Sequence, residues 1–130
     1  MYEKGEIIVE INVLDLVEQF KLLTQNLWVY AFLGMVVLDF ITGYVRAFIT
    51  GVADSSIGMK GLVKHAYVVC LVLIIYPFLS LIGHSVMADS IITFYILNYG
   101  LSVYENTVAI GIPLPTGLIS KEKLNKLKKK

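Results

Sequence analysis

Three charged residues lie within long apolar stretches of this 130-residue sequence, namely Asp39, Arg46 and Glu105. A charge near the middle of a membrane-spanning helix costs about 2.5–3.5 kcal/mol on insertion scales, so each of these charges needs a partner or water. Offsets of 4 and 7 residues return to nearly the same face of a helix. Counted from Asp39, these offsets reach Gly43 and Arg46, and Thr42 lies beside them. The sequence therefore predicts a polar stripe along this helix.

A second polar stripe follows the same geometry in the last apolar stretch. Asn98, Ser102 and Glu105 are spaced by the same offsets, and Asn106 flanks them. One interpretation is a water-filled path lined by several copies of the chain, because three helices enclose too little space for a wide pore. The other is a buried polar contact within the chain, in which Arg46 and Glu105 form an ion pair. The residues alone leave both interpretations open.

The remaining reactive side chains do not form a catalytic pattern. His65 and His84 are separated by a whole apolar stretch, and the single cysteine, Cys70, lies within that stretch. We find no nucleophile with a matching base, no phosphate-binding loop and no metal-ligand spacing. We therefore expect no enzymatic activity, no metal and no cofactor.

The composition is that of a membrane protein. Hydrophobic residues make up 57% of the chain and charged residues only 16%, whereas soluble domains have roughly 45–50% and about 25%. Three apolar stretches, 27–49, 66–83 and 91–114, are each close to the roughly 20 residues that span a bilayer as a helix, and the second span becomes 63–83 if the Lys64 side chain reaches back to the interface. We predict an all-α membrane protein with three transmembrane helices, in which the segments 50–65 and 84–90 contain the loops.

The charges predict how the chain is oriented and divided. Residues 1–26 carry two bases and five acids, whereas the last ten residues carry six lysines and one acid. The positive-inside rule therefore places the N-terminus outside and the C-terminus on the cytoplasmic side, with Trp28 at the outer interface of the membrane. The expected parts are an extracytoplasmic or interfacial segment (1–26), a transmembrane domain (27–114) and a basic tail (115–130). The tail lysines are Lys121, Lys123, Lys126, Lys128, Lys129 and Lys130.

Two further patterns concern helix contacts. Residues 6–20 favour an N-terminal amphipathic helix that lies in the membrane interface. Gly43, Ala47 and Gly51 recur every four residues, and such small residues let helix backbones approach closely in membranes. We predict that these three residues form a helix-packing face.

Three motifs together resemble one family. DFITGYVRAF (Asp39–Phe48), SSIGMKGLVKH (Ser55–His65) and YENTVAIGIPLP (Tyr104–Pro115) are similar to segments of the phage-lysis and toxin-secretion holins, which have three transmembrane helices. The resemblance covers roughly residues 27–120. The positions that match the family pattern are Asp39, Thr42, Gly43, Arg46, Ala47, Ser56, Gly58, Lys60, Gly61, Lys64, Glu105, Asn106, Gly111, Pro113 and Pro115.

The resemblance implies a multi-pass protein of the bacterial cytoplasmic membrane that forms homo-oligomers. Such a holin opens a timed lesion that releases a murein hydrolase (endolysin), causing host lysis, or a toxin. Its implied partners are membrane lipid, other copies of itself and, functionally, the released hydrolase or toxin, with no nucleic acid. A small ion or proton channel, an antiholin and a membrane scaffold subunit are the alternatives that the sequence leaves open.

Overall fold

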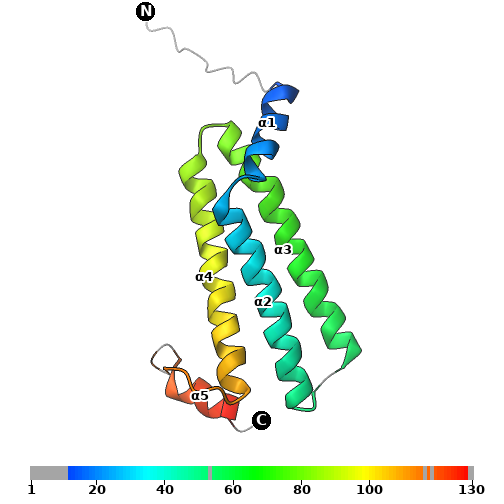
Figure 1. Ribbon diagram of the computed structural model, residues 1–130, viewed down its shortest axis with the longest axis vertical. Coiled ribbons are helices and arrows are strands. Elements are labelled where there is room, and N and C mark those ends of the chain that lie inside the picture. The colour runs from blue at the N-terminus through cyan, green and yellow to red at the C-terminus, as the bar shows by residue number, and fades with distance from the viewer. Residues whose placement is uncertain (1–11, 53, 116, 118, 129–130) are drawn as a thin grey trace, which may run out of the picture.

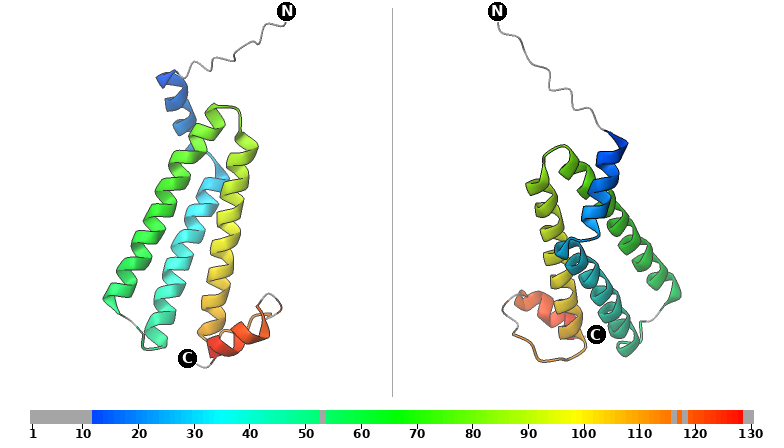
Figure 2. Two further views of the ribbon diagram at one scale, coloured as in Figure 1. Left: turned by 180° about the vertical axis from the view of Figure 1, so that it is seen from behind. Right: turned by 45° about the horizontal axis from the view of Figure 1, so that its top comes forward.

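The computed structural model is a bundle of helices, and it describes residues 12–128 apart from 53, 116 and 118. The helices are α1 (Val13–Leu23), α2 (Leu27–Ile49), α3 (Ser55–Leu81), α4 (Ser85–Ala109) and α5 (Lys121–Lys128). The three long helices run side by side, α1 packs against α3, and α5 lies crosswise where α4 ends (Figures 1 and 2). We call this end of the bundle, where α2 also ends, the tail end.

The prediction of an all-α protein with three apolar spans is confirmed. Among the described residues, the segments Leu27–Ile49, Gly58–Leu81 and Ser85–Ala109 are long and apolar enough to cross a membrane. Their outer surfaces carry large hydrophobic side chains that are well exposed in the single chain, including Phe48 at 78% and Leu97 at 68%. Such a surface suits contact with lipid tails, which need no hydrogen bonds.

The loops in the structure are much shorter than the predicted ones. α3 already begins at Ser55 and α4 at Ser85, whereas α4 ends at Ala109 and does not reach residue 114. Hydropathy places a boundary at the first charges, but a helix begins where its free N–H groups are capped. Asp54 provides that cap for α3, because its carboxylate accepts a hydrogen bond from the Ser56 amide at 2.9 Å.

Each long helix ends at a glycine in the left-handed conformation. Gly51, Gly83 and Gly111 have φ values of 70°, 82° and 89°, which glycine adopts without steric cost. Behind each glycine, the next amide donates to a carbonyl five residues back, as Val52 does to Ala47 at 3.1 Å. This is the Schellman ending of a helix. Gly51 thus terminates α2, and the packing role predicted for Gly43, Ala47 and Gly51 stays a prediction.

The core of the bundle is the seam between α2 and α4. The buried residues of α2 recur every three or four positions, and those of α4 include Ile92, Tyr99 and Asn106, which are seven residues apart. Phe32 packs between two tyrosine rings, Tyr95 and Tyr99, with ring centroids 6.2 and 6.1 Å away. Since α2 and α4 run in the same direction (Figure 1), this spacing matches the seam of a parallel coiled coil. Toward the tail end the seam becomes polar.

The structure describes only part of the N-terminal segment and of the C-terminal tail. Residues 6–11 of the predicted amphipathic helix, and Lys129 and Lys130 of the tail, lie outside the described residues. The described part of the N-terminal segment forms α1, with exposed apolar side chains such as Val13 and Leu14. Its position in the membrane interface stays a prediction.

Candidate functional site

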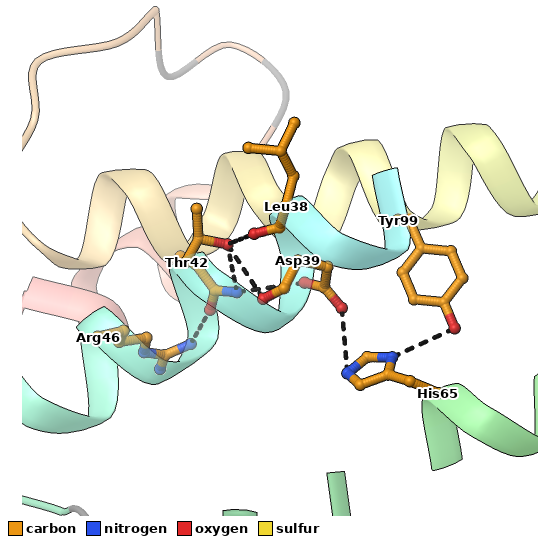
Figure 3. A network of polar contacts seen from close by, with 7 residues as sticks. Leu38, Asp39, Thr42, Arg46, His65 and Tyr99 are labelled. Carbon is orange, nitrogen blue, oxygen red and sulfur yellow. Dashed lines mark hydrogen bonds and ion pairs between the residues drawn. The ribbon is translucent and has the colours of Figure 1, made fainter. Parts of the chain in front are cut away.

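Asn106 of α4 lies at the centre of a polar network on the seam. Its amide nitrogen donates to Asp39 Oδ1 at 3.3 Å and to Thr42 Oγ1 at 3.4 Å, and its Oδ1 accepts from Arg46 Nη1 at 3.2 Å (Figure 3). Asp39 and Asn106 are both buried, each with 7% of its surface exposed. One amide group thus connects a carboxylate, a hydroxyl and a guanidinium of the neighbouring helix.

The third long helix joins this network through His65. Its Nε2 lies 3.7 Å from Asp39 Oδ2, and its Nδ1 lies 3.3 Å from the Tyr99 hydroxyl (Figure 3). The imidazole ring also packs edge-on against Phe40, with ring centroids 6.3 Å apart. His65 therefore contacts α2 and α4 at the same level, and the polar network links all three long helices.

Helical spacing explains why α2 presents its part of the network together. Asp39, Thr42 and Arg46 follow one another at intervals of three and four residues, so their side chains lie on one face. Thr42 also donates its hydroxyl hydrogen bond to the Leu38 carbonyl at 2.9 Å, which keeps it beside its own helix. Gly43 lies on the same seam, and a Cβ atom there would be 3.6 Å from the Asn106 amide nitrogen, an ordinary contact.

The network leaves no described buried polar atom without a partner. Every buried side-chain nitrogen and oxygen in the described part of the chain has a hydrogen-bond partner. A buried polar group that loses its partner costs about 1–3 kcal/mol, and more when it is charged. The charges that the sequence places in lipid are therefore stabilised within one chain, and the interpretation of a buried polar contact describes this closed arrangement.

The polar stripe predicted on α4 is divided in the structure. Asn106, which the prediction placed at its flank, lies on the seam, and Ser102 is half-buried beside a cavity next to it. Glu105 instead forms an ion pair with Lys123 of α5, and Asn98 is exposed on the outer surface. The structure thus brings Asp39, Thr42, Gly43, Arg46 and Asn106 together, and it separates Asn98 and Glu105 from them.

The structure does not contain the Arg46–Glu105 ion pair that one of the two interpretations included. Arg46 donates to Asn106, and Glu105 binds the tail. Neighbouring residues on a helix point about 100° apart, so only one of Glu105 and Asn106 can face α2. The packing of Ile92 and Tyr99 into the seam selects Asn106, because it follows them at the same seven-residue spacing. Whether the predicted residues line a pore stays a prediction.

His65 and Tyr99 are the network residues that the sequence reasoning missed. His65 was assigned to a loop, but it lies one turn beyond Gly61 in α3. The seven-residue repeat through Ile92, Tyr99 and Asn106 was the signal that could have found Tyr99. If the predicted helix is started at its capping residue, Asp54, it includes His65.

The tail is bound to the end of α4 by two polar contacts and has one buried apolar residue. Lys123 pairs with Glu105, the Tyr104 hydroxyl donates to the Pro115 carbonyl, and Ile119 is buried. At the other end of the bundle, Asn26 donates to the Tyr76 hydroxyl at 2.7 Å, and this hydroxyl donates to Asp89 at 2.8 Å. Trp28 lies near that end with 56% of its surface exposed. The described lysines Lys121, Lys123 and Lys126 therefore lie at the opposite end of the bundle from Trp28.

The polar groups of the network can change their hydrogen-bond partners. Within the described ranges, no three histidine, cysteine or acidic side chains are grouped so that they could hold a metal ion. Asp39, Arg46, Asn106 and His65 all exchange hydrogen bonds readily with water as well as with one another. The arrangement can therefore hold α2, α3 and α4 together, and the same side chains can be hydrated if the helices separate.

Comparisons with known proteins agree with this architecture. Residues 19–129 match the bacteriophage holin family, a stretch that includes the three long helices and all of the described tail. An uncharacterized protein of Listeria innocua is 31% identical over 113 residues, which are 85% of this chain and 81% of the relative. An uncharacterized 14.9 kDa protein in the nagH 3′ region of Clostridium perfringens is 31% identical over 100 residues, covering 75% of this chain and 74% of the relative. No solved structure matches the chain. The match over most of its length shows that the chain belongs to the bacteriophage holin family.

Proposed function

We propose that this protein is a holin that accumulates in the bacterial cytoplasmic membrane, oligomerises and opens a lesion at a set time. Through this lesion a murein hydrolase reaches the cell wall, or a toxin leaves the cell. Family membership and the three apolar helices support a holin-like membrane protein. The charge distribution supports an orientation with the lysine-rich tail in the cytoplasm.

The observation that carries the proposal is the hydrogen-bonded polar network on the α2–α4 seam. In a single chain its groups bind one another, so the helices can stay in lipid without exposing charge. If α2 moves away from α4, the same groups lose these partners and need water or another chain. Several copies that turn these faces toward one another would supply a shared aqueous space. The network therefore suits a protein that is harmless when closed and hydrated when open.

Controlled expression in bacteria tests this function. Membrane potential is followed with a dye, and culture turbidity reports lysis in cells that also express a cytoplasmic murein hydrolase. We expect a sudden loss of potential, followed by lysis only in cells that contain the hydrolase. Loss of potential without lysis would indicate a small ion or proton channel instead, and would overturn the proposal of a lesion wide enough for protein.

A second experiment separates the holin from an antiholin or a scaffold subunit. Neither of these would cause leakage alone, and an antiholin would delay lysis by a co-expressed holin. The purified protein in vesicles that contain a protein-sized fluorescent cargo should release this cargo above a threshold amount of protein per vesicle. Retention of cargo at every amount, together with delayed lysis by another holin in cells, would contradict the proposal.

A further inference from the structure

A cavity of about 430 Å³ lies between α2 and α3, next to the polar network. The two helices diverge toward the tail end (Figure 1), and the cavity occupies part of the space between them. Glycines line it on both sides: Gly43 on α2, and Gly58 and Gly61 on α3. A Cβ atom at Gly61 would meet nothing within 4 Å. A side chain at Gly61 would therefore have room to extend into this space.

The lining of this cavity is polar at both of its ends. Asp39, His65 and Asn106 belong to the network and form the end that lies deep between the helices. Asp54 and Ser55, which are both exposed, line the opposite end, where α2 connects to α3. Apolar side chains such as Phe40, Tyr44 and Val52 also line the cavity, so the polar groups at its two ends are the partners that bound water needs. Lipid tails in the same space would leave the cavity side of these groups without hydrogen-bond partners.

The apolar half of the seam closes the far end. Beyond Asp39, the buried cluster joins α2 to α3, because Phe32 and Val36 of α2 and Val72 of α3 all belong to it. Water that enters between α2 and α3 would therefore stop at the level of Asp39.

We propose that this cavity is a water-filled vestibule of the single, closed chain. It opens where α2 connects to α3 and admits water and small hydrophilic solutes as far as Asp39. This inference concerns the chain before any assembly and does not rest on the proposed lesion. It implies that the closed protein places water against one side of the polar network, so that only the apolar half of the seam separates the two aqueous phases.

Cysteine accessibility tests the vestibule. In a Cys70→Ser background, single cysteines are placed at Gly43 and Ala47, which line the cavity, and at Leu38, which faces outward on the same helix. The full chain is reconstituted in vesicles and treated with a membrane-impermeant methanethiosulfonate reagent, added to either side. Ser55→Cys, at the mouth, reports which side the α2–α3 connection faces and that the reagent is active. Retention of a small trapped dye shows that the vesicles are closed.

We expect Gly43→Cys and Ala47→Cys to react from the same side as Ser55→Cys. Their rates should exceed that of Leu38→Cys by about tenfold or more, because the reactive thiolate forms in water and not in lipid. Filling the cavity with Gly61→Leu should slow labelling at Gly43 and leave labelling at Ser55 unchanged.

Two results would overturn the proposal. One is labelling at Ser55 with no labelling at Gly43 or Ala47 above the Leu38 level, which would indicate that lipid fills the space. The other is equal labelling of Gly43 from both sides of dye-retaining vesicles, which would indicate a continuous path. Ala47→Cys keeps the test valid if Gly43→Cys does not fold. Neither result depends on whether the protein lyses cells.

Discussion

Replacement of Asn106 by leucine gives the sharpest test of the polar network. Leucine has nearly the same shape as asparagine, so the change removes the hydrogen bonds to Asp39, Thr42 and Arg46 with little change in packing. Hydrogen bonds between membrane helices average about 0.6 kcal/mol, so three bonds amount to about 2 kcal/mol. This corresponds to about a 25-fold weaker association of α2 with α4, because 1.4 kcal/mol is tenfold.

The Asn106→Leu substitution should destabilise the closed state more than an open state. In the closed bundle, Asp39 and Arg46 would be left without their shared partner, whereas in an aqueous space water replaces it. We therefore expect Asn106→Leu to permeabilise cells earlier than the unchanged protein. Asn98→Leu is the matched control, because it makes the same substitution on the same helix at a position exposed on the outer surface.

Two assays check the prediction. The first is the time between induction and loss of membrane potential in cells. The second is the free energy of unfolding of the purified protein in mixed micelles with increasing dodecyl sulfate, followed by fluorescence of the single tryptophan, Trp28. A variant with unchanged timing and unchanged unfolding free energy would refute the reasoning that these bonds hold the bundle closed. If Asn98→Leu has the same effect as Asn106→Leu, the polarity of α4 matters in general and the network does not.

Three further predictions address the tail and the helix ends. Glu105→Gln should weaken the binding of the tail by less than about 1 kcal/mol, since the ion pair of Glu105 with Lys123 is partly exposed. We expect faster proteolysis within α5 for this variant but not for the control Glu122→Gln. Equal proteolysis rates for the two variants would contradict the prediction. Replacing the lysines of residues 121–130 with glutamine should give a population with both membrane orientations, because each lysine contributes about 1 kcal/mol near anionic lipid. Reporter fusions at both termini measure the orientation, and a uniform orientation would refute the prediction. Gly51→Ala should lower the free energy of unfolding by about 1–2 kcal/mol, because alanine resists a φ of 70°; Gly34→Ala, at an open helical position, should not lower it.

The sequence alone determined the three apolar helices and the family resemblance. Length and hydropathy suffice for the helices, because a helix in lipid must satisfy its own backbone and needs about 20 apolar residues to cross. The spacing of Asp39, Thr42 and Arg46 also predicted that these side chains share one face, since this depends only on the helical repeat.

The tertiary structure decided which polar groups meet. Helical periodicity defines the faces of α4, but only its packing against α2 selects the one that carries Asn106 and directs Glu105 toward the tail. The start of α3 depends on the cap at Asp54, and this start makes His65 a helical residue that reaches Asp39. Such contacts join residues far apart in the chain, and their geometry follows from the rotation and depth of packed helices, which the local sequence does not specify.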